Sequence, residues 1–488
     1  MDINNKCNDK KLNLAALIFS VLAIKIIVFL IDPTVMFFIN DSSRYIDTAV
    51  SSYIPPDRSF LYGFLIRWLT YSSQSLTSLV LFQVLCSAAS SVLAGYILNR
   101  FLSVNPIIAT VFSLLCAVAP LQLFYERYVL TETVALLFFA LFVTAALRHL
   151  KYPKIRTLFF LGLSGVVLIA FRLSYLPIVM TGAVITPGLA FFYPREEGMG
   201  NIIEGPRIWR SGVRKSVVKT FVYILVSCLF TYGLHYTYKT INGKLSDKRP
   251  AYQYCTGFHL ISSWAPLLEK EDLSDPMIWG YNDHYIHFNL KNRFQRMKQR
   301  WSYYGIVSYM YRLYSSRIKA DEEAYKTAMN ILKRNPFGII RLAFTSYMDY
   351  WNMTLLKENL RMDRSAKQYP AKLKEILNTH YNLYAENLGF QKTLTNQYFF
   401  NAIPWFMVIF SLPFVIAVVI FLDKVRQLIP LALLGGFSML ILINATVLIH
   451  RNTMRFSHPN EWIAIIFLGL FCDRILKLAS KKREGMHH

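Results

Sequence analysis

The segment DSSRYID, residues 41–47, brings two carboxylates and an arginine close together in the sequence. Helical spacing would put Asp41, Arg44 and Tyr45 on one face. A carboxylate placed in this way can accept the proton that a hydroxyl loses as it attacks, while neighbouring cations hold a phosphate. The same segment also fits the start of a loop helix, where Asp41 would act only as a cap. Asp41 is therefore interpreted either as a general base or as a cap, and Asp47 accompanies it in both cases.

Arginines that could bind a phosphate recur in two other places. Arg58 follows Asp41 in the same loop, and the turn RNTMRFSHPNE contains Arg451, Arg455 and His458 between two strongly apolar segments. The planar guanidinium suits phosphate because it forms paired, charge-assisted hydrogen bonds. The alternative is a solvated loop whose arginine side chains extend along the membrane surface. The clustering favours an anion site built from these side chains.

The turn YERYVLTETV contains further carboxylates. Glu132 begins an apolar run, so it is either a helix N-terminal residue stabilised by the helix dipole or a member of the site. Glu126 and Arg127 are expected to form an exposed pair at the membrane surface. Arg172 interrupts another apolar segment near its outward end and could reach the same candidate site. Lys25 lies inside the first apolar segment, where a charge is costly, and is expected to face the bundle or to extend towards the interface.

No complete metal or cofactor site is evident in the sequence. Asp283, His284 and His287 in GYNDHYIHF resemble a fragment of a metal site, but a full set of ligands is not evident. No Asp-x-Asp pattern stands beside Asp41. A phosphate-cradling glycine loop, a serine-centred elbow and paired-cysteine zinc spacing are also missing. We therefore expect no cofactor, and a divalent metal is unsupported.

The composition indicates which elements must position these side chains. Of the 488 residues, 54% are hydrophobic and only 17% are charged, whereas soluble domains carry roughly 25% charged residues. Disorder is excluded because the apolar fraction is too high. A membrane-crossing helix needs about 20 mainly apolar residues. We therefore predict an all-α polytopic membrane protein with about ten spans, at residues 12–31, 76–98, 106–124, 129–147, 157–173, 177–193, 216–236, 401–421, 428–449 and 460–478.

The formal net charge of +24 is distributed in a way that predicts orientation. With ten spans, all the short basic loops fall on one side, and Lys and Arg mark the cytoplasmic side. Both termini are therefore expected in the cytoplasm and the candidate site outside it. The chain divides into 1–236, about seven spans with the candidate catalytic loop 32–75, then 237–400, an extracytoplasmic and mainly helical segment, and 401–488, three spans. An apolar stretch with interspersed charges at 337–353 is expected to lie in the interface.

These motifs together resemble the GT-C superfamily of membrane glycosyltransferases, which use polyprenyl-phosphate-linked sugars. NDSSRYIDTA with the following Pro-Pro and RSFLYGFLI is similar to the family's acidic first-loop motif. YVLTETVALLFFAL is similar to its Ser/Thr-Glu entry into the fourth span, and AMNILKRNPFGIIRLAF and MRFSHPNEW resemble its helix-Pro-helix and Arg-aromatic-x-x-Pro patterns. The first loop departs from many members at Asp57 and Arg58, where they have apolar residues. The chain also resembles bacterial serotype-modifying O-antigen glucosyltransferases and the protein mannosyltransferase and aminoarabinose transferase group.

The resemblance implies an inverting sugar transfer from a polyprenyl-phosphate donor, with Asp41 as the catalytic base. By motif, it assigns Arg455 to the donor phosphate together with Arg451 or Arg58. The remaining substrate-binding candidates are polar side chains grouped near these: Arg44, Asp47, Glu132, Arg172 and His458. The acceptor would be an envelope glycan, lipid or protein, with a lipopolysaccharide O-antigen preferred. A bacterial inner membrane is the implied location.

Three other functions compete with this interpretation. An O-antigen ligase or polymerase is also polytopic, with a large outward loop carrying Arg and His, but it lacks the acidic first loop. A lipid-linked sugar flippase or transporter would place polar residues at mid-depth and often has repeated halves, whereas the polar groups here gather at one face. Nucleic-acid binding, which a strongly basic chain can suggest, is excluded because much of the basic surplus lies in short cytoplasmic loops.

Overall fold

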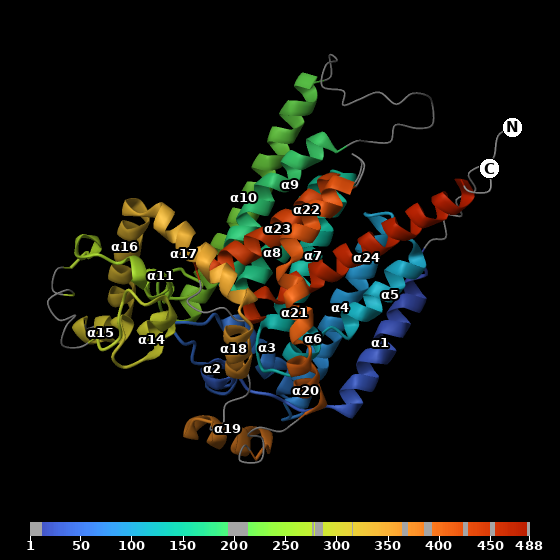
Figure 1. Ribbon diagram of the computed structural model, residues 1–488. Coiled ribbons are helices and arrows are strands. Elements are labelled where there is room, and N and C mark those ends of the chain that lie inside the picture. The colour runs from blue at the N-terminus through green and yellow to red at the C-terminus, as the bar shows by residue number, and fades with distance from the viewer. Residues whose placement is uncertain are drawn as a thin grey trace.

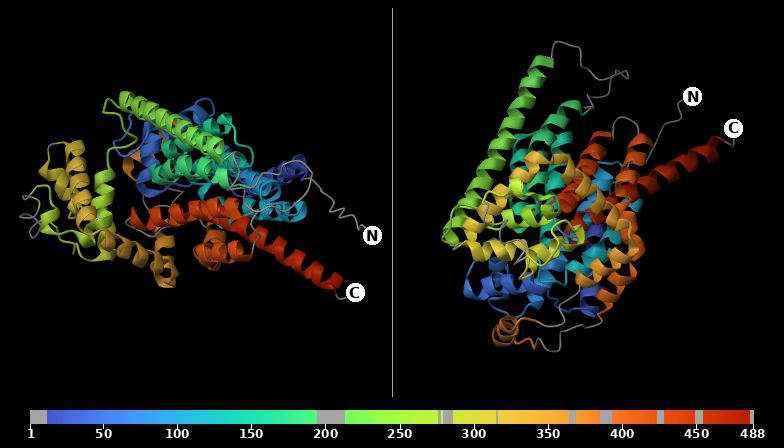
Figure 2. Two further views of the ribbon diagram at one scale, coloured as in Figure 1. Left: turned by 90° about the horizontal axis from the view of Figure 1, so that it is seen from above. Right: turned by 60° about the vertical axis from the view of Figure 1, so that its left-hand side comes forward.

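The computed structural model describes residues 12–193, 213–275, 278, 286–314, 316–363, 369–384, 393–422, 428–448 and 454–485. Across these ranges the chain forms α-helices and short 3-10 turns and no β-strand, and one backbone bridge joins Met36 to Tyr128. The prediction of an all-α fold is confirmed. Figures 1 and 2 show a bundle of long helices with a lobe of shorter helices on one side.

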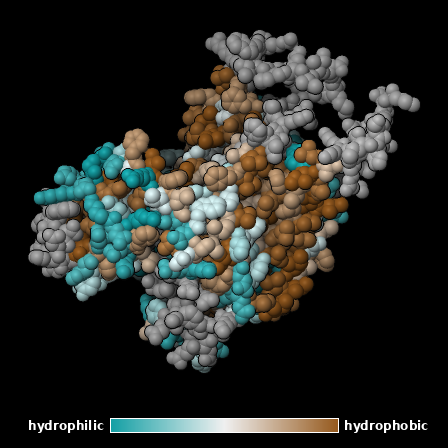
Figure 3. Space-filling view, viewed as in Figure 1, coloured by the Kyte–Doolittle hydropathy of each residue, from teal (hydrophilic) through white to brown (hydrophobic). Residues whose placement is uncertain are grey.

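Six helices in the described part of the chain are long and apolar enough to cross a membrane. They are α1 (Leu14–Ile31), α4 (Thr77–Arg100), α7 (Glu132–Lys151), Leu173–Phe192 with α9 (Leu176–Phe192), the Val217–Leu245 part of α10 (Val213–Leu245), and α23 (Leu428–Val447). Three shorter apolar helices are α3 (Phe60–Thr70), α5 (Pro106–Ala117) and α8 (Ile155–Phe171). Figure 3 shows a broad hydrophobic surface over α1 and α5. A polytopic membrane protein is therefore confirmed, and the number of about ten spans stays a prediction.

Two of the expected spans are interrupted by short breaks. In 106–124, α5 ends before α6 (Pro120–Tyr125) begins, because a proline inside a helix lacks the N–H for its hydrogen bond and clashes with the preceding turn. In 401–421 the chain instead forms consecutive short helices, α20 (Leu394–Asn401), α21 (Ile403–Phe410) and α22 (Leu412–Leu422). The expectation of one unbroken helix in each segment is wrong.

Residues 237–400, expected as one extracytoplasmic unit, belong to two hydrophobic cores. Four helices form a lobe with a core of its own: α11 (Thr256–Trp264), α14 (Arg296–Trp301), α15 (Ile306–Leu313) and α16 (Arg317–Arg334). This outer lobe lies to the left in Figure 1 and presents a largely hydrophilic surface in Figure 3. In contrast, α18 (Met353–Asp363) and α19 (Ala371–Tyr381) contribute to the core of the bundle. The helix α10 also passes unbroken through the expected boundary at 236.

The helix α17 (Pro336–Met348) follows α16 directly, as the helix-Pro-helix pattern predicted. It packs against α23 and buries Ile339 and Leu342, while Phe337, Ile340 and Phe344 form an exposed apolar row. Spacings of three and four residues place that row on one face of the helix. An exposed apolar face beside a membrane bundle suits a helix that lies in the interface. That placement remains our proposal.

The helix α7 is central to the bundle. It packs against α4, α8, α9 and α24 (Met454–Gly485). Its first residue, Glu132, contacts Arg455 near the start of α24, so these two helix ends lie together. The helix α2 (Ile39–Ser51), which precedes α3, lies at the same end and carries Asp41.

Candidate active site

Backbone contacts fix the segment before α2 against the turn before α7. The Met36 N–H donates to the Arg127 carbonyl at 2.8 Å, and the Val129 N–H donates to the Met36 carbonyl at 2.9 Å. These bonds form the parallel bridge between Met36 and Tyr128. Because backbone pairing satisfies groups that burial would otherwise leave without partners, this crossing is a rigid support for the residues that follow it in both segments.

The first turn of α2 is then held by a serine. Ser42 Oγ donates to the Val129 carbonyl at 2.9 Å and accepts from the Phe38 N–H at 2.8 Å. Phe38 is the N-cap residue of α2 and offers no side-chain cap, so the Ser42 hydroxyl satisfies its backbone instead. Asp41 is the neighbour of this serine and is therefore held beside the start of α7, where Glu132 lies.

The Asp41 carboxylate binds two arginines, one through each oxygen. Oδ1 accepts from Arg58 Nη2, and Oδ2 accepts from Arg455 Nη1. Arg58 also lies over the ring of Tyr45, 5.5 Å from its centroid. Of the two interpretations of Asp41, the helix cap is not what the geometry shows, because both oxygens face guanidinium groups rather than backbone N–H groups. Spacing along the helix did predict that Asp41 and Tyr45 share a face.

The two guanidiniums determine the protonation of Asp41. Burial alone would raise the pKa of this carboxyl, but the charges of Arg58 and Arg455 outweigh burial and hold the pKa well below its usual range. An opposite charge at contact distance favours the ionised form. Asp41 is therefore a carboxylate in this state, and it is a weak base for as long as both arginines remain bound to it.

Arg455 joins Asp41 to a second carboxylate. Its Nε donates to Glu132 Oε1, and Arg172 Nη1 lies 3.1 Å from the same oxygen. Arg172 also donates to the Arg455 carbonyl at 3.1 Å and lies over the Phe456 ring. The network of Arg58, Asp41, Arg455, Glu132 and Arg172 thus joins the first loop, the start of α7, the end of α8 and the start of α24. We call it the arginine–carboxylate network.

Two other candidate residues, Arg44 and Asp47, lie outside this network. Arg44 pairs with Asp57, a buried carboxylate that Arg58 Nη1 also approaches at 3.6 Å. Asp47 faces elsewhere and pairs with Lys372 of α19 at 2.8 Å. Arg451 lies outside the described residues. Asp57 is the residue that sequence reasoning noted only as a departure, although its position beside Arg58 in a proline-rich loop was the available signal.

His458 and Glu461 follow Arg455 on α24 at intervals of one helical turn and are both buried. The carboxylate of Glu461 accepts from the Leu121 and Gln122 N–H groups, both at 3.2 Å. It thus satisfies two buried N–H groups in the first turn of α6 that have no partner within the helix. The His458 ring packs 5.2 Å from that of Tyr125, and neither ring nitrogen has a hydrogen-bond partner among the described residues. His458 therefore packs behind the network rather than joining it.

The possible fragment of a metal site in GYNDHYIHF lies mostly outside the described residues. Asp283 and His284 lie outside the described residues, and the His287 ring packs edge-on against Tyr304 at 4.4 Å. Within the described ranges, no group of three or more His, Cys, Asp or Glu side chains is close enough to hold a metal ion. The candidate site itself is built of carboxylates and guanidiniums.

Comparisons with known proteins give little beyond this geometry. No family model matches the sequence, and no curated protein matches it. Among solved structures, the chain is similar to the crystal structure of ArnT from Cupriavidus metallidurans bound to undecaprenyl phosphate, with a TM-score of 0.33 and 11% sequence identity over 94% of this chain and 78% of that chain. A likeness at that level assigns neither activity nor residue roles.

A second group of charges lies within the bundle, and here the expectation of an exposed pair is wrong. Glu126 and Arg127 are fully buried, and Lys25 of α1 reaches Glu126 Oε2 at 2.8 Å while Arg127 Nη1 lies 3.0 Å from Glu126 Oε1. Lys25 therefore faces the bundle rather than the interface. The Glu126 carboxylate pairs with both cations through different oxygens, because a buried charge is costly when it has no partner. This triad pins α1 to the turn before α7.

Replacing Glu126 with glutamine is expected to lower the free energy of unfolding by about 3–5 kcal/mol, the usual cost of breaking a buried pair. The change leaves Lys25 and Arg127 side by side without a counterion. Thermal or denaturant unfolding of the detergent-solubilised protein measures it. The matched control is Glu323→Gln, which breaks a surface pair with Lys326 and should leave the free energy of unfolding close to that of the wild type. Equal losses in the two variants would contradict the structural role of the triad.

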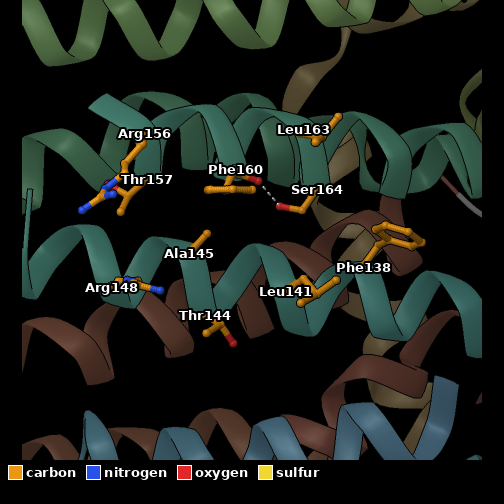
Figure 4. Close-up of a pocket in the computed structure, with 10 residues that line it drawn as sticks. All are labelled: Phe138, Leu141, Thr144, Ala145, Arg148, Arg156, Thr157, Phe160, Leu163 and Ser164. Atoms are coloured by element: carbon orange, nitrogen blue, oxygen red, sulfur yellow. Dashed lines mark hydrogen bonds between the residues drawn. The ribbon is translucent and has the colours of Figure 1, made fainter. Parts of the chain in front are cut away.

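A groove of about 460 Å³ lies between α7 and α8, away from the network. Figure 4 shows Arg148 and Arg156 towards one end of it and Phe138 towards the other, with Leu141 and Phe160 along its length. Sixteen residues separate Glu132 from Arg148 on α7, which corresponds to about 24 Å along the helix. The lining is mostly apolar, so the groove suits a lipid chain and not the chemistry of the network.

Proposed function

We propose that the protein is an inverting glycosyltransferase that moves a sugar from a polyprenyl-phosphate donor to an envelope acceptor on the extracytoplasmic side. The observation that carries the proposal is the Asp41 carboxylate held between Arg58 and Arg455 at one end of a membrane bundle. A carboxylate can deprotonate an acceptor hydroxyl, and two arginines can bind the leaving phosphate. The motif resemblance to the GT-C superfamily supports the same reaction.

The reaction is a single displacement at the anomeric carbon of the donor sugar. The acceptor oxygen attacks this carbon from the face opposite the phosphate, and the bond from the carbon to the phosphate oxygen breaks as the new bond forms. The electron pair of the broken bond leaves with the polyprenyl phosphate, whose added negative charge Arg455 and Arg58 stabilise. The hydroxyl proton passes to Asp41. The product therefore has inverted anomeric configuration.

Binding of the donor would also activate Asp41. In the free protein both of its oxygens are bound by guanidiniums, which makes it a weak base. A donor phosphate competes for these guanidiniums and releases the carboxylate, whose pKa then rises towards the ordinary aspartate range. Glu132 keeps hold of Arg455 through Nε during this exchange. Arg172 in turn holds Glu132, so Arg455 stays positioned while one of its partners changes.

The finer assignments rest on the sequence resemblance. Serotype-modifying glucosyltransferases share the size and layout of this chain, so we propose a lipopolysaccharide O-antigen or another surface glycan as the acceptor. We also propose a bacterial inner membrane with both termini in the cytoplasm. The polar network lies at one end of the bundle rather than at mid-depth, and this placement favours an enzyme over a flippase.

The proposed function is tested with the purified full-length protein in phosphatidylcholine nanodiscs. Undecaprenyl-phosphate glucose, galactose, mannose and aminoarabinose are offered as donors, with purified lipopolysaccharide or water as acceptor. We expect release of undecaprenyl phosphate from at least one donor, and nuclear magnetic resonance of the product should show inverted anomeric configuration. Retained configuration would overturn the mechanism. Turnover only with diphosphate-linked glycan chains would favour an O-antigen ligase or polymerase.

A further inference from the structure

A second group of arginines meets the candidate active site from the outer lobe. The Tyr254 N–H donates to the Pro56 carbonyl at 2.5 Å, and this bond joins the segment leading into α11 to the first loop. On the lobe side of this junction, Arg300 of α14 and Arg317 of α16 lie close enough to Arg44 of α2 for their charges to act on it. We call Arg44, Arg300 and Arg317 the lobe arginines.

Aromatic rings hold two of these side chains in place. Arg300 lies over the Phe258 ring, 5.4 Å from its centroid, and Arg317 lies over the Tyr311 ring at 5.0 Å. The two rings pack on each other with centroids 4.5 Å apart. The guanidiniums thus flank an aromatic pair, a geometry that supports a cation while leaving its N–H groups available. Arg300 and Arg317 are therefore positioned by aromatic rings, whereas Arg44 is held by its ion pair with Asp57.

Of the lobe arginines, Arg300 has the most buried N–H groups without a hydrogen-bond partner among the described residues. Its residue is only 3% exposed, yet Nε and Nη2 have no hydrogen-bond partner among the described residues. Nε of Arg317 is likewise buried and unpartnered there. Buried donors left unsatisfied cost free energy, and more when the group is charged. A built arrangement of this kind indicates that an acceptor belongs there when the protein works.

The charges in this region do not balance. Among the described residues, and setting aside Arg249, which also acts on Asp321 but pairs with Glu322, six arginines face four carboxylates. The arginines are Arg44, Arg58, Arg172, Arg300, Arg317 and Arg455, and the carboxylates are Asp41, Asp57, Glu132 and Asp321. Burial, followed by the positive charges of Arg58, Arg317 and Arg300 in particular, lowers the pKa of Arg44. Like charges gathered in a half-buried place repel one another unless a counterion enters. The surplus of two positive charges matches a phosphate or two separate anionic groups.

We infer that the lobe arginines form a second oxyanion site, beside the one proposed for the donor phosphate, that takes a phosphate or carboxylate group of a substrate. This inference rests on the proposed function, since that function supplies the first oxyanion. Arg58 lies between the two sites, because it contacts Asp41 on one side and Asp57 on the other. The second oxyanion comes from an acidic acceptor, or from a second phosphate of the donor if the donor carries a diphosphate in place of the monophosphate of the proposed function.

Binding by the full-length protein in phosphatidylcholine nanodiscs separates the two sources. If the donor supplies the oxyanion, undecaprenyl diphosphate should bind about tenfold or more tightly than undecaprenyl phosphate, the effect of one or two charge-assisted hydrogen bonds. If the acceptor supplies it, the two lipids should bind alike, and glucose 6-phosphate should bind about tenfold or more tightly than glucose. In either case, each of the single variants Arg300→Gln and Arg317→Gln should remove the affinity difference that the wild-type protein shows.

The control is Arg312→Gln, which removes an exposed arginine of the same lobe that lies over Tyr303. It should leave both affinity differences intact. Arg317→Gln serves as the second variant if Arg300→Gln fails to fold, because Arg317 is only partly buried. The inference is overturned if the wild-type protein shows neither affinity difference. It is also overturned if Arg300→Gln and Arg317→Gln both keep the difference that the wild type shows. The proposed function fails separately, when Arg455→Gln binds undecaprenyl phosphate as tightly as wild type does.

Discussion

Replacing Asp41 with asparagine is expected to lower kcat by about 10²- to 10⁴-fold, the usual contribution of a positioned general base. Asparagine keeps the shape of the side chain but cannot accept the proton from the acceptor hydroxyl. The Kd for undecaprenyl phosphate should stay the same or fall, because a neutral amide no longer competes with the phosphate for Arg58 and Arg455. Sugar transfer and lipid binding by the same nanodisc preparation measure both quantities.

The matched control for this variant is Asp247→Asn. Asp247 is exposed and has a left-handed backbone conformation (φ 53°), which asparagine also tolerates. Its kcat should equal that of wild type. Equal activity of Asp41→Asn and Asp247→Asn in a purified assay would sink the assignment of Asp41 as the base. A loss of folded protein in Asp41→Asn alone would instead show as a change in thermal unfolding.

The pH dependence of the wild type gives a second readout of Asp41. Because its folded-state pKa is depressed, kcat/KM for the free protein should keep its full value down to a pH below the ordinary aspartate range. The acid limb of kcat should lie at higher pH, because the bound donor has taken the arginines away. Stability follows the same sign, so the contribution of Asp41 is present above its unfolded pKa and is lost only in stronger acid.

Replacing Arg455 with glutamine is expected to weaken undecaprenyl phosphate binding by about tenfold and to lower kcat by about 10²- to 10³-fold. The guanidinium bridges Asp41 and Glu132 through different nitrogens, and neither glutamine nor lysine can reproduce that fork. Arg455→Lys should therefore recover part of the binding but little of kcat. Equilibrium binding and single-turnover transfer separate the two effects.

Arg312→Gln is again the control for the removal of a charge, and it should change neither quantity. Thermal unfolding distinguishes a lost contact from a lost fold, because Arg172 still holds Glu132 at 3.1 Å when Arg455 is changed. If Arg455→Gln kept wild-type binding and kcat, the role of Arg455 at the donor phosphate, and with it the proposed function, would be contradicted.

Loop positions in the sequence were sufficient to predict that Asp41, Glu132 and Arg455 belong to one end of the bundle. Each lies next to an apolar segment whose direction follows from the basic loops. The partners of each charge could not be predicted in the same way, because periodicity indicates the buried face of a helix and not the element that covers it. Asp41 and Arg455 are 414 residues apart, so only the packed bundle brings them into contact.

The same limitation explains the error at Glu126 and Arg127. A short polar turn between apolar segments has the same sequence whether it meets water or another helix. Its partner, Lys25, lies 101 residues earlier in the chain. The breaks in the predicted spans were easier to predict from the sequence, because Pro120 and Pro413 mark positions where an unbroken helix would lose a hydrogen bond.

The pair between Lys25 and Glu126 also imposes an order on biosynthesis. A lysine near the middle of a membrane helix opposes insertion by roughly 2.5–3.5 kcal/mol, and α1 is apolar enough to enter the bilayer despite it. The carboxylate that neutralises Lys25 leaves the ribosome about a hundred residues later, so α1 first stands in lipid with its lysine extended towards the surface. Joining α1 to the bundle must therefore follow synthesis of the turn before α7. A chain that stalls or misassembles earlier leaves a lone lysine in the bilayer, where an unpaired charge is costly.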